Sequence, residues 1–201
     1  MSRAPLPAFH DDLDACFAEA WRLLAEGVER GRSGFHLPAL ATLDPAGAPR
    51  VRTVVLRAVD RGAGTLRFHC DRRSAKADEI ARNGACALMA YDGETSVQIR
   101  AEGQGSLHTG DALAEAAWAA AQPMSRVCYG TVPGPGIAIP EGGAYALPDA
   151  DEALRLGRPH FAAVVVRVAS LDFLYLDRRG HRRARWDRAG AAPWTGRWLV
   201  P

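Results

Sequence analysis

Short apolar runs separated by turn residues constrain the fold of this chain more than any other feature. A run at residues 35–43 ends in Asp44-Pro45-Ala46-Gly47, and a second run covers residues 49–59. Because proline and glycine favour turns, the two runs predict a hairpin. Further strand-like runs follow at residues 65–70, 86–91, 95–107, 161–168, 171–176 and 181–186.

Helical segments interrupt these runs. Residues 11–30 place apolar side chains at intervals of three and four, with Asp and Glu on the other faces, which predicts an amphipathic helix. Shorter helices are expected at residues 74–82, 111–121 and 150–156. Residues 122–148 are rich in proline and glycine, so we expect a long loop there.

The order of these elements indicates the fold class. Strands joined by short turns, without regular alternation of strand and helix, favour an antiparallel barrel over a doubly wound parallel sheet. A length of 201 residues suits one domain with a good core. We therefore expect a single domain over residues 1–201 that is mainly β with helical inserts.

Composition limits the classes of partner. The net charge is +2 and no stretch is apolar enough to span a bilayer, so neither nucleic acid nor a membrane is expected as a partner. The cysteines, Cys16, Cys70, Cys86 and Cys128, are scattered and form no C-x-x-C pair, which indicates reduced thiols and a cytoplasmic protein. No histidine spacing is diagnostic of an axial haem ligand, and no metal is expected.

Residues 177–186 raise an alternative, because arginines cluster there beside Trp186. Such a cluster is compatible with nucleic-acid binding. Asp172, Asp177 and Asp187 flank the arginines, so a hairpin with paired charges is favoured. A strong salt dependence of DNA binding would support the alternative.

Three segments combine a strand pattern with groups suited to a phosphate or a polar ring. Residues 50–57 carry three arginines, residues 68–76 run from a strand end into a helix, and residues 96–103 place Gln98 on a strand. Unpaired N–H groups at a helix start favour a phosphate, and Lys76, the only lysine among 25 basic residues, lies at such a start. An amide such as Gln98 donates and accepts hydrogen bonds at once, which suits the polar edge of a flavin.

In order and spacing, R-T-V-V-L-R, F-H-C-D-R-R-S-A-K-A and V-Q-I-R-A-E-G resemble motifs of the pyridoxamine 5′-phosphate oxidase-like family. The similarity covers residues 37–107 and returns at residues 181–183 and 198–201. It implies an antiparallel split β-barrel that binds flavin mononucleotide (FMN) and forms a homodimer with FMN at the subunit interface. It also implies an oxidoreductase that transfers a hydride at flavin N5 to or from a small-molecule substrate.

The resemblance also implies residue roles. Lys76 and Ser74 would hold the FMN phosphate, Gln98 would address the ring, and Arg183 would come from the partner subunit. The implied cofactor-binding residues are Arg52, Thr53, Val54, Val55, His69, Cys70, Ser74, Lys76, Gln98 and Arg183. The implied substrate-binding residues are Arg57, Trp118, Ser125 and His181.

The chain departs from the family mainly at substrate-binding positions. The family's tyrosine, arginine and serine that grip a substrate phosphate correspond to Trp118, Gln122 and Ser125, and a family tryptophan aligns with Leu174. Ala75 replaces an arginine before the helical lysine. These departures indicate a divergent branch rather than the true oxidase. Two alternatives stay open: a flavin-binding protein without turnover, and a split-barrel relative that uses deazaflavin or haem.

Overall fold

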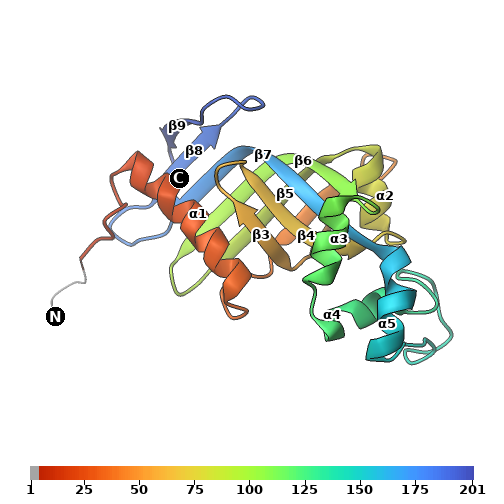
Figure 1. Cartoon of the computed structure of the whole chain (residues 1–201). Helices are drawn as coiled ribbons and strands as arrows, with labels where there is room; N and C mark the ends of the chain where they lie inside the picture. The colour runs from red at the N-terminus through yellow and green to blue at the C-terminus, as the bar shows by residue number, and fades with distance from the viewer. Residues whose placement is uncertain (1–4) are drawn as a thin grey trace.

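The computed structural model describes residues 5–201, and residues 1–4 of the expected domain lie outside the described part. Its nine strands form one antiparallel sheet that curls into a barrel (Figure 1). The strands are β1 (Ala39–Leu43), β2 (Pro49–Thr53), β3 (Leu56–Asp60), β4 (Thr65–Asp71), β5 (Ala85–Asp92), β6 (Val97–His108), β7 (Phe161–Tyr175), β8 (Arg182–Asp187) and β9 (Thr195–Leu199). Their order is β2-β1-β5-β6-β7-β4-β3, and β8 with β9 branches from β7.

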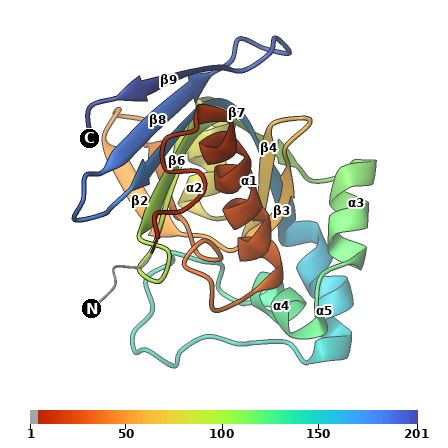
Figure 2. The ribbon, with the colours of Figure 1, turned by 90° about the vertical axis from the view of Figure 1, so that its left-hand side faces the viewer.

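The helices pack around this sheet. α1 (Leu13–Glu29) begins at Asp12, whose carboxylate accepts a hydrogen bond from the Ala15 N–H at 2.9 Å. The other helices are α2 (Ala75–Arg82), α3 (Ala112–Ala119), α4 (Pro123–Val127) and α5 (Ala150–Gly157), with 3₁₀ turns η1 (Cys128–Gly130) and η2 (Arg158–His160). Figure 2 shows α1 across the barrel and α3, α4 and α5 grouped to one side. Within residues 5–201, no helix combines the length and apolar character that a membrane span requires.

Alternation along the strands builds the core. Ile99 of β6, Phe68 of β4 and Phe173 of β7 are all buried inside the barrel. A second, smaller apolar cluster contains Ala117, Trp118, Phe161 and Ala163, where α3 packs against β7. The site described below adjoins this second cluster.

The structure divides the strand predicted at residues 49–59 into two. β2 pairs with β1 and β3 pairs with β4, so consecutive strands lie at opposite ends of the sheet path. Between them, the Val54 N–H donates to the Pro38 carbonyl at 3.0 Å and the Leu56 N–H donates to the His36 carbonyl at 2.9 Å. We call this junction the seam. Its hydrogen bonds hold the chain where it crosses from β2 to β3, so the apolar run at residues 49–59 forms two strands.

Other expectations need correction. The loop predicted at residues 122–148 begins with α4 and η1, because Pro123 has a backbone geometry suited to the first helical position. β7 is continuous, and the irregularity lies in its neighbour β6, between Glu102 and Gly103. β9 was not expected, because its mostly exposed sequence shows no apolar alternation.

Candidate functional site

Arg52, near the end of β2, is held by two buried groups. Its guanidinium donates to the Glu79 carboxylate on α2 at 2.7 Å and to the Thr42 hydroxyl on β1. Thr42 in turn donates to Glu79 at 2.5 Å. Because Glu79 is only 5% exposed, its charge is well placed to neutralise and orient Arg52 beside α2.

Lys76 lies one turn before Glu79, at the start of α2. Its ammonium donates to the Ser74 hydroxyl at 3.3 Å, and that hydroxyl donates to the Asp71 carbonyl at 2.6 Å. Lys76 makes no ion pair with a carboxylate within residues 5–201. A cation near a helix start is disfavoured by the helix dipole, so an anion bound here would relieve an existing electrostatic conflict.

Arg57 is the extra residue of a β-bulge. Leu56 pairs with Phe68 and Ala58 pairs with Arg67, so Arg57 has no partner on β4. The bulge re-aims the side chain, which lies with Arg67 and His69 on one cavity. This Arg57 cavity has a volume of about 180 Å³ and is lined by Val28, Arg57, Arg67, His69, Ala117, Ala120, Ala121, Gln122 and Ser125.

His69 faces the Arg57 cavity as a neutral imidazole. Burial lowers its pKa to about 4, and the charges of Arg67 and Arg57 add to the effect. His69 Nε2 and Arg67 Nε are buried without a hydrogen-bond partner. The Phe161 ring packs against the imidazole in an edge-on arrangement, with centroids 4.9 Å apart. The lining contains two guanidiniums and no carboxylate.

Gln98 and Arg183 lie in one row across the outer face of the sheet. Gln98 on β6 pairs with Leu174 on β7, and Leu174 pairs with Arg183 on β8. Leu174 therefore separates the two polar side chains. Leu174 is the residue that the family resemblance aligns with a tryptophan.

Lys76 and Gln98 of one chain lie far apart. Ile80 of α2 is the side chain closest to Gly105 of β6, and Gly105 lies seven residues along the strand from Gln98. Seven residues of extended strand span about 23 Å. In Figure 1, α2 and β8 lie at different ends of the sheet.

Asp172 on β7 links two arginines beside this row. Its Oδ2 accepts from Arg100 at 3.0 Å and from Arg183 Nε and Nη2 at 3.1 and 3.0 Å. Asp172 is 2% exposed, and its Oδ1 is buried without a partner. The Asp172 carboxylate thus orients Arg183. The cluster of Asp172, Arg100 and Arg183 carries a net positive charge, because it contains two guanidiniums and one carboxylate.

Replacing Asp172 with alanine is expected to lower the free energy of unfolding by about 3 kcal/mol, because two guanidiniums would face each other without a counter-charge. Partial solvent access of both arginines keeps the loss at the lower end of the range for buried pairs. Urea denaturation measures it. Asp151→Ala, on the exposed surface of α5, is the control and is expected to change stability by about 0.5 kcal/mol. Equal losses in the two variants would contradict the assignment.

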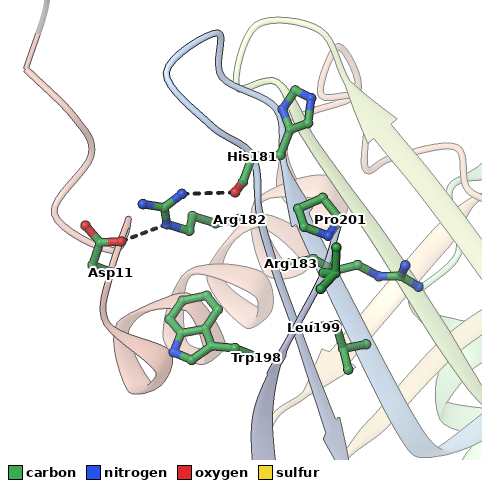
Figure 3. A pocket seen from close by; sticks show the side chains of 8 residues that line it. Asp11, His181, Arg182, Arg183, Trp198, Leu199 and Pro201 are labelled. Atoms are coloured by element: carbon green, nitrogen blue, oxygen red, sulfur yellow. Dashed lines mark hydrogen bonds and ion pairs between the residues drawn. The ribbon is translucent and has the colours of Figure 1, made fainter.

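A second cavity of about 490 Å³ is lined by Asp11, His181, Arg182, Arg183, Trp198, Leu199, Val200 and Pro201. Figure 3 shows Arg182 directed toward Asp11, with Arg182 Nε 2.7 Å from Asp11 Oδ1, and Arg183 extended the other way. His181 Nδ1 accepts a hydrogen bond from the Asp177 N–H at 3.1 Å. The structure therefore places His181 and Arg183 on one cavity, and Arg57 and Ser125 on another.

Trp118, a predicted substrate contact, lies in the second apolar cluster. Its ring is 8% exposed and packs against Phe161 and Tyr129, with centroids 5.2 and 5.9 Å away. The neighbouring Ala117 and Ala121 line the Arg57 cavity instead. Trp118 therefore anchors α3 on β7, and its role as a substrate contact stays a prediction.

The remaining predicted cofactor residues differ in exposure. Thr53 is exposed, Val55 is half-buried, and Val54 and Cys70 are buried at 6% and 4% exposure. Burial raises the pKa of the Cys70 thiol to about 11, so the thiol is protonated at neutral pH.

Three residues of the site were missed by the motif analysis. Glu79 follows Lys76 by three residues, which places both on neighbouring turns of one helix face. Arg67 alternates with His69, so both point to the same face of β4. Both signals are present in the sequence. The role of Asp172 depends on the pairing of β6, β7 and β8 and has no local signal.

Comparison with known proteins identifies relatives of this sequence. Residues 18–109 match the family profile of the pyridoxamine 5′-phosphate oxidase, FMN-binding domain. The pyridoxine/pyridoxamine 5′-phosphate oxidase of Erythrobacter litoralis is 36% identical over 89 residues, which cover 42% of this chain and 41% of that protein. The same enzyme of Roseobacter denitrificans is 34% identical over 119 residues, covering 59% and 57%. The matches thus span about half the length of these relatives.

Two solved structures share the fold over nearly the whole chain. A pyridoxamine 5′-phosphate oxidase-related, FMN binding protein from Nostoc punctiforme superposes with a TM-score of 0.72 and 26% identity, covering 98% of this chain and 100% of that chain. PhzG from Burkholderia lata, solved in complex with tetrahydrophenazine-1-carboxylic acid, gives a TM-score of 0.74 at 23% identity, with 100% of both chains covered. The likeness to PhzG concerns the fold alone. The predicted antiparallel split barrel is confirmed, and residues 18–109 match the FMN-binding domain of the pyridoxamine 5′-phosphate oxidase family.

Proposed function

We propose that this protein is a cytoplasmic FMN-dependent oxidoreductase that acts on a small molecule at two equivalent sites of a homodimer. The observation that carries the proposal is Lys76, which contacts Ser74 at the start of α2 without a carboxylate partner in residues 5–201. Both residues lie inside the region that matches an FMN-binding domain. When bound, flavin supplies hydride chemistry at N5.

The residues present fit both ends of FMN. A phosphate would accept hydrogen bonds from Lys76 and Ser74, with Lys76 as the main cation because Arg52 is already paired with Glu79. Gln98 can donate and accept at the polar edge of the ring. Arg183 carries a positive charge that would favour negative charge on the reduced ring.

The distance between these two groups supports a site built from two chains. About 23 Å of strand separates Gln98 from the point where α2 reaches β6, which is farther than one FMN extends. We therefore assign Lys76 of one chain and the row of Gln98 and Arg183 of the other chain to the same cofactor. Arg57 follows Arg52 by five residues in the sequence. We propose the Arg57 cavity as the substrate side of the site, with Arg57 and Ser125 as contacts.

The visible absorption spectrum of the purified protein tests the cofactor assignment. We expect a flavin spectrum, and heat denaturation should release FMN. Pyridoxamine phosphate is expected not to reduce the bound flavin, because the family's phosphate-gripping residues are replaced at Trp118 and Gln122. A colourless protein that also fails to bind added FMN would refute the proposal. Bound FMN that no reductant or substrate can reduce would favour the non-catalytic alternative.

Mixed dimers test the two-chain site. Lys76→Met and Arg183→Met homodimers should each bind FMN weakly, because each variant damages every site. Co-expressed chains that pair at random should regain roughly a quarter of the wild-type capacity, since half of the dimers are mixed and each has one intact site. Equilibrium dialysis with FMN measures the capacity. No recovery in dimers shown to be mixed would mean that both residues act within one chain.

A further inference from the structure

A serine, a histidine and an aspartate lie in hydrogen-bonding order where β6 leads into α3. Ser106 Oγ lies 3.1 Å from His108 Nε2, and His108 Nδ1 lies 2.6 Å from Asp111 Oδ2. Neither the Arg57 cavity nor the second cavity contains these residues. We call them the surface triad, and we propose that it is a second reactive site, in which Ser106 acts as a nucleophile toward small activated esters.

Strand geometry brings Ser106 and His108 together. They lie two residues apart on β6, so both side chains leave the same face of the strand. Gly105 faces the other way, because a Cβ there would lie 3.1 Å from the Ile80 side chain of α2. The surface triad therefore lies on the opposite face of β6 from α2, and its chemistry requires no bound FMN.

Asp111 uses its two carboxylate oxygens for different tasks. Oδ1 accepts a hydrogen bond from the Ala114 N–H at 2.9 Å and so caps α3, while Oδ2 faces His108 Nδ1. The bond from Ala114, followed by the one from His108, lowers the pKa of Asp111, which keeps the group ionised at neutral pH. A carboxylate accepts the Nδ1 proton, which leaves Nε2 of a neutral ring as an acceptor for Ser106.

The Ser106 hydroxyl has a choice of two acceptors. His108 Nε2 is 3.1 Å away, and the Val165 carbonyl oxygen across the strand pair is 3.3 Å away. The imidazole is the nearer group and the more basic one, so it can take the hydroxyl proton during attack, which a carbonyl oxygen cannot. Because Ser106 is exposed, an ester can reach Oγ without a change in the fold.

The reaction is acyl transfer followed by hydrolysis. As Ser106 Oγ bonds to the acyl carbon, its proton moves to His108 Nε2, and the departing alcohol takes that proton when its C–O bond breaks. Water then attacks the acyl-serine with His108 again as the base, and the carboxylic acid and free Ser106 are released. No oxidant, reductant or metal enters this balance. Since the surface triad lies outside both cavities, we assign small acyl groups on good leaving groups as its substrates.

Labelling with an alkyl fluorophosphonate tests the nucleophile. Oγ attacks phosphorus and fluoride leaves, so the product is a stable phosphonyl-serine that tandem mass spectrometry assigns to one residue. We expect Ser106 to carry the label in the wild-type protein, and Ser106→Ala to hydrolyse 4-nitrophenyl acetate at least tenfold more slowly. No label on Ser106, or an unchanged rate of hydrolysis in Ser106→Ala, would overturn the proposal.

Variants of the other two residues test the hydrogen-bonded order. His108→Gln should slow the labelling of Ser106 about a hundredfold, because it removes the general base. Asp111→Asn keeps a good cap on α3 and should slow labelling at least tenfold, because an amide holds the imidazole less firmly in the required tautomer. His160→Gln, outside the surface triad, should react as the wild type does. Equal labelling rates in the wild type and His108→Gln would show an exposed serine without a base, which contradicts the proposal.

The tautomer of His108 provides a test on the unaltered protein. Long-range ¹H–¹⁵N NMR at about pH 8 should show a proton on Nδ1 and none on Nε2. A protonated Nε2 would leave Ser106 without its base and overturn the inference.

The outcomes also separate this inference from the proposed function. Circular dichroism establishes that each variant is folded, and FMN binding is measured on the same preparations. FMN binding without labelling of Ser106 overturns only the inference. Labelling of Ser106 in a protein that fails to bind FMN overturns only the cofactor assignment.

Discussion

Lys76→Met is expected to weaken FMN binding on the order of a hundredfold, so that the purified variant loses its flavin colour. Lys76 is the principal unpaired cation at the proposed phosphate position, because Arg52 is already neutralised by Glu79. A hydrogen bond to a charged group contributes about 3 kcal/mol, which corresponds to an affinity change of this size. Fluorescence titration of the flavin-free protein with FMN gives the dissociation constant.

Folding provides an internal control for this prediction. Removing a cation from the first turn of α2 should leave the stability of the flavin-free protein unchanged or raise it by about 0.3 kcal/mol. Arg82→Met, in the last turn of the same helix, is the matched variant and should retain wild-type affinity. If both variants bind FMN as the wild type does, the phosphate position is wrong. If both lose it equally, the effect is general electrostatics and not a specific contact.

Gly103→Ala is expected to destabilise the fold by about 3 kcal/mol or more. A Cβ at this position would collide with the Arg167 carbonyl and lie 2.9 Å from its carbon and 3.0 Å from the Val168 Cα. All of these atoms belong to the backbone of β7, so no side-chain rotation can relieve the overlap. Gly103 also sits at the register shift of β6, where the two longest strands are joined.

Thermal and urea denaturation of Gly103→Ala measure this loss. Gly110→Ala is the matched control, because a Cβ there would meet nothing within 4 Å. Its stability should stay within about 0.5 kcal/mol of the wild type, since an exposed turn glycine has no steric role to lose. A Gly103→Ala variant as stable as Gly110→Ala would show that the β6–β7 pair can shift to accommodate a methyl group.

Elements with a local signal could be predicted from the sequence. α1 follows from its apolar spacing, and α2 from a short polar helix placed after a strand end. Ser74 and Lys76, the proposed phosphate-binding pair, are two residues apart, so their proximity follows from the sequence without knowledge of the fold. The motif segments were therefore the most informative part of the sequence.

Features that depend on distant pairing could not be predicted. The seam depends on hydrogen bonds from Val54 and Leu56 to residues that precede β1. Trp118 belongs to an apolar helix face, and its packing against Phe161 depends on a strand more than 40 residues further along the chain. The position of Arg57 depends on a bulge, because it is the unpaired residue between the Leu56–Phe68 and Ala58–Arg67 pairs.

The seam also joins the two parts of the proposed site. Arg52 lies on one edge of the split and Arg57 on the other, and the chain between them is tied down by the amides of Val54 and Leu56. A substrate at the Arg57 edge and a cofactor at the Arg52 edge would each restrain the same short crossing, so occupancy of one should lower the entropy cost of the other. Hydrogen exchange at these two amides reads that coupling directly, as slower opening of the barrel when either site is filled.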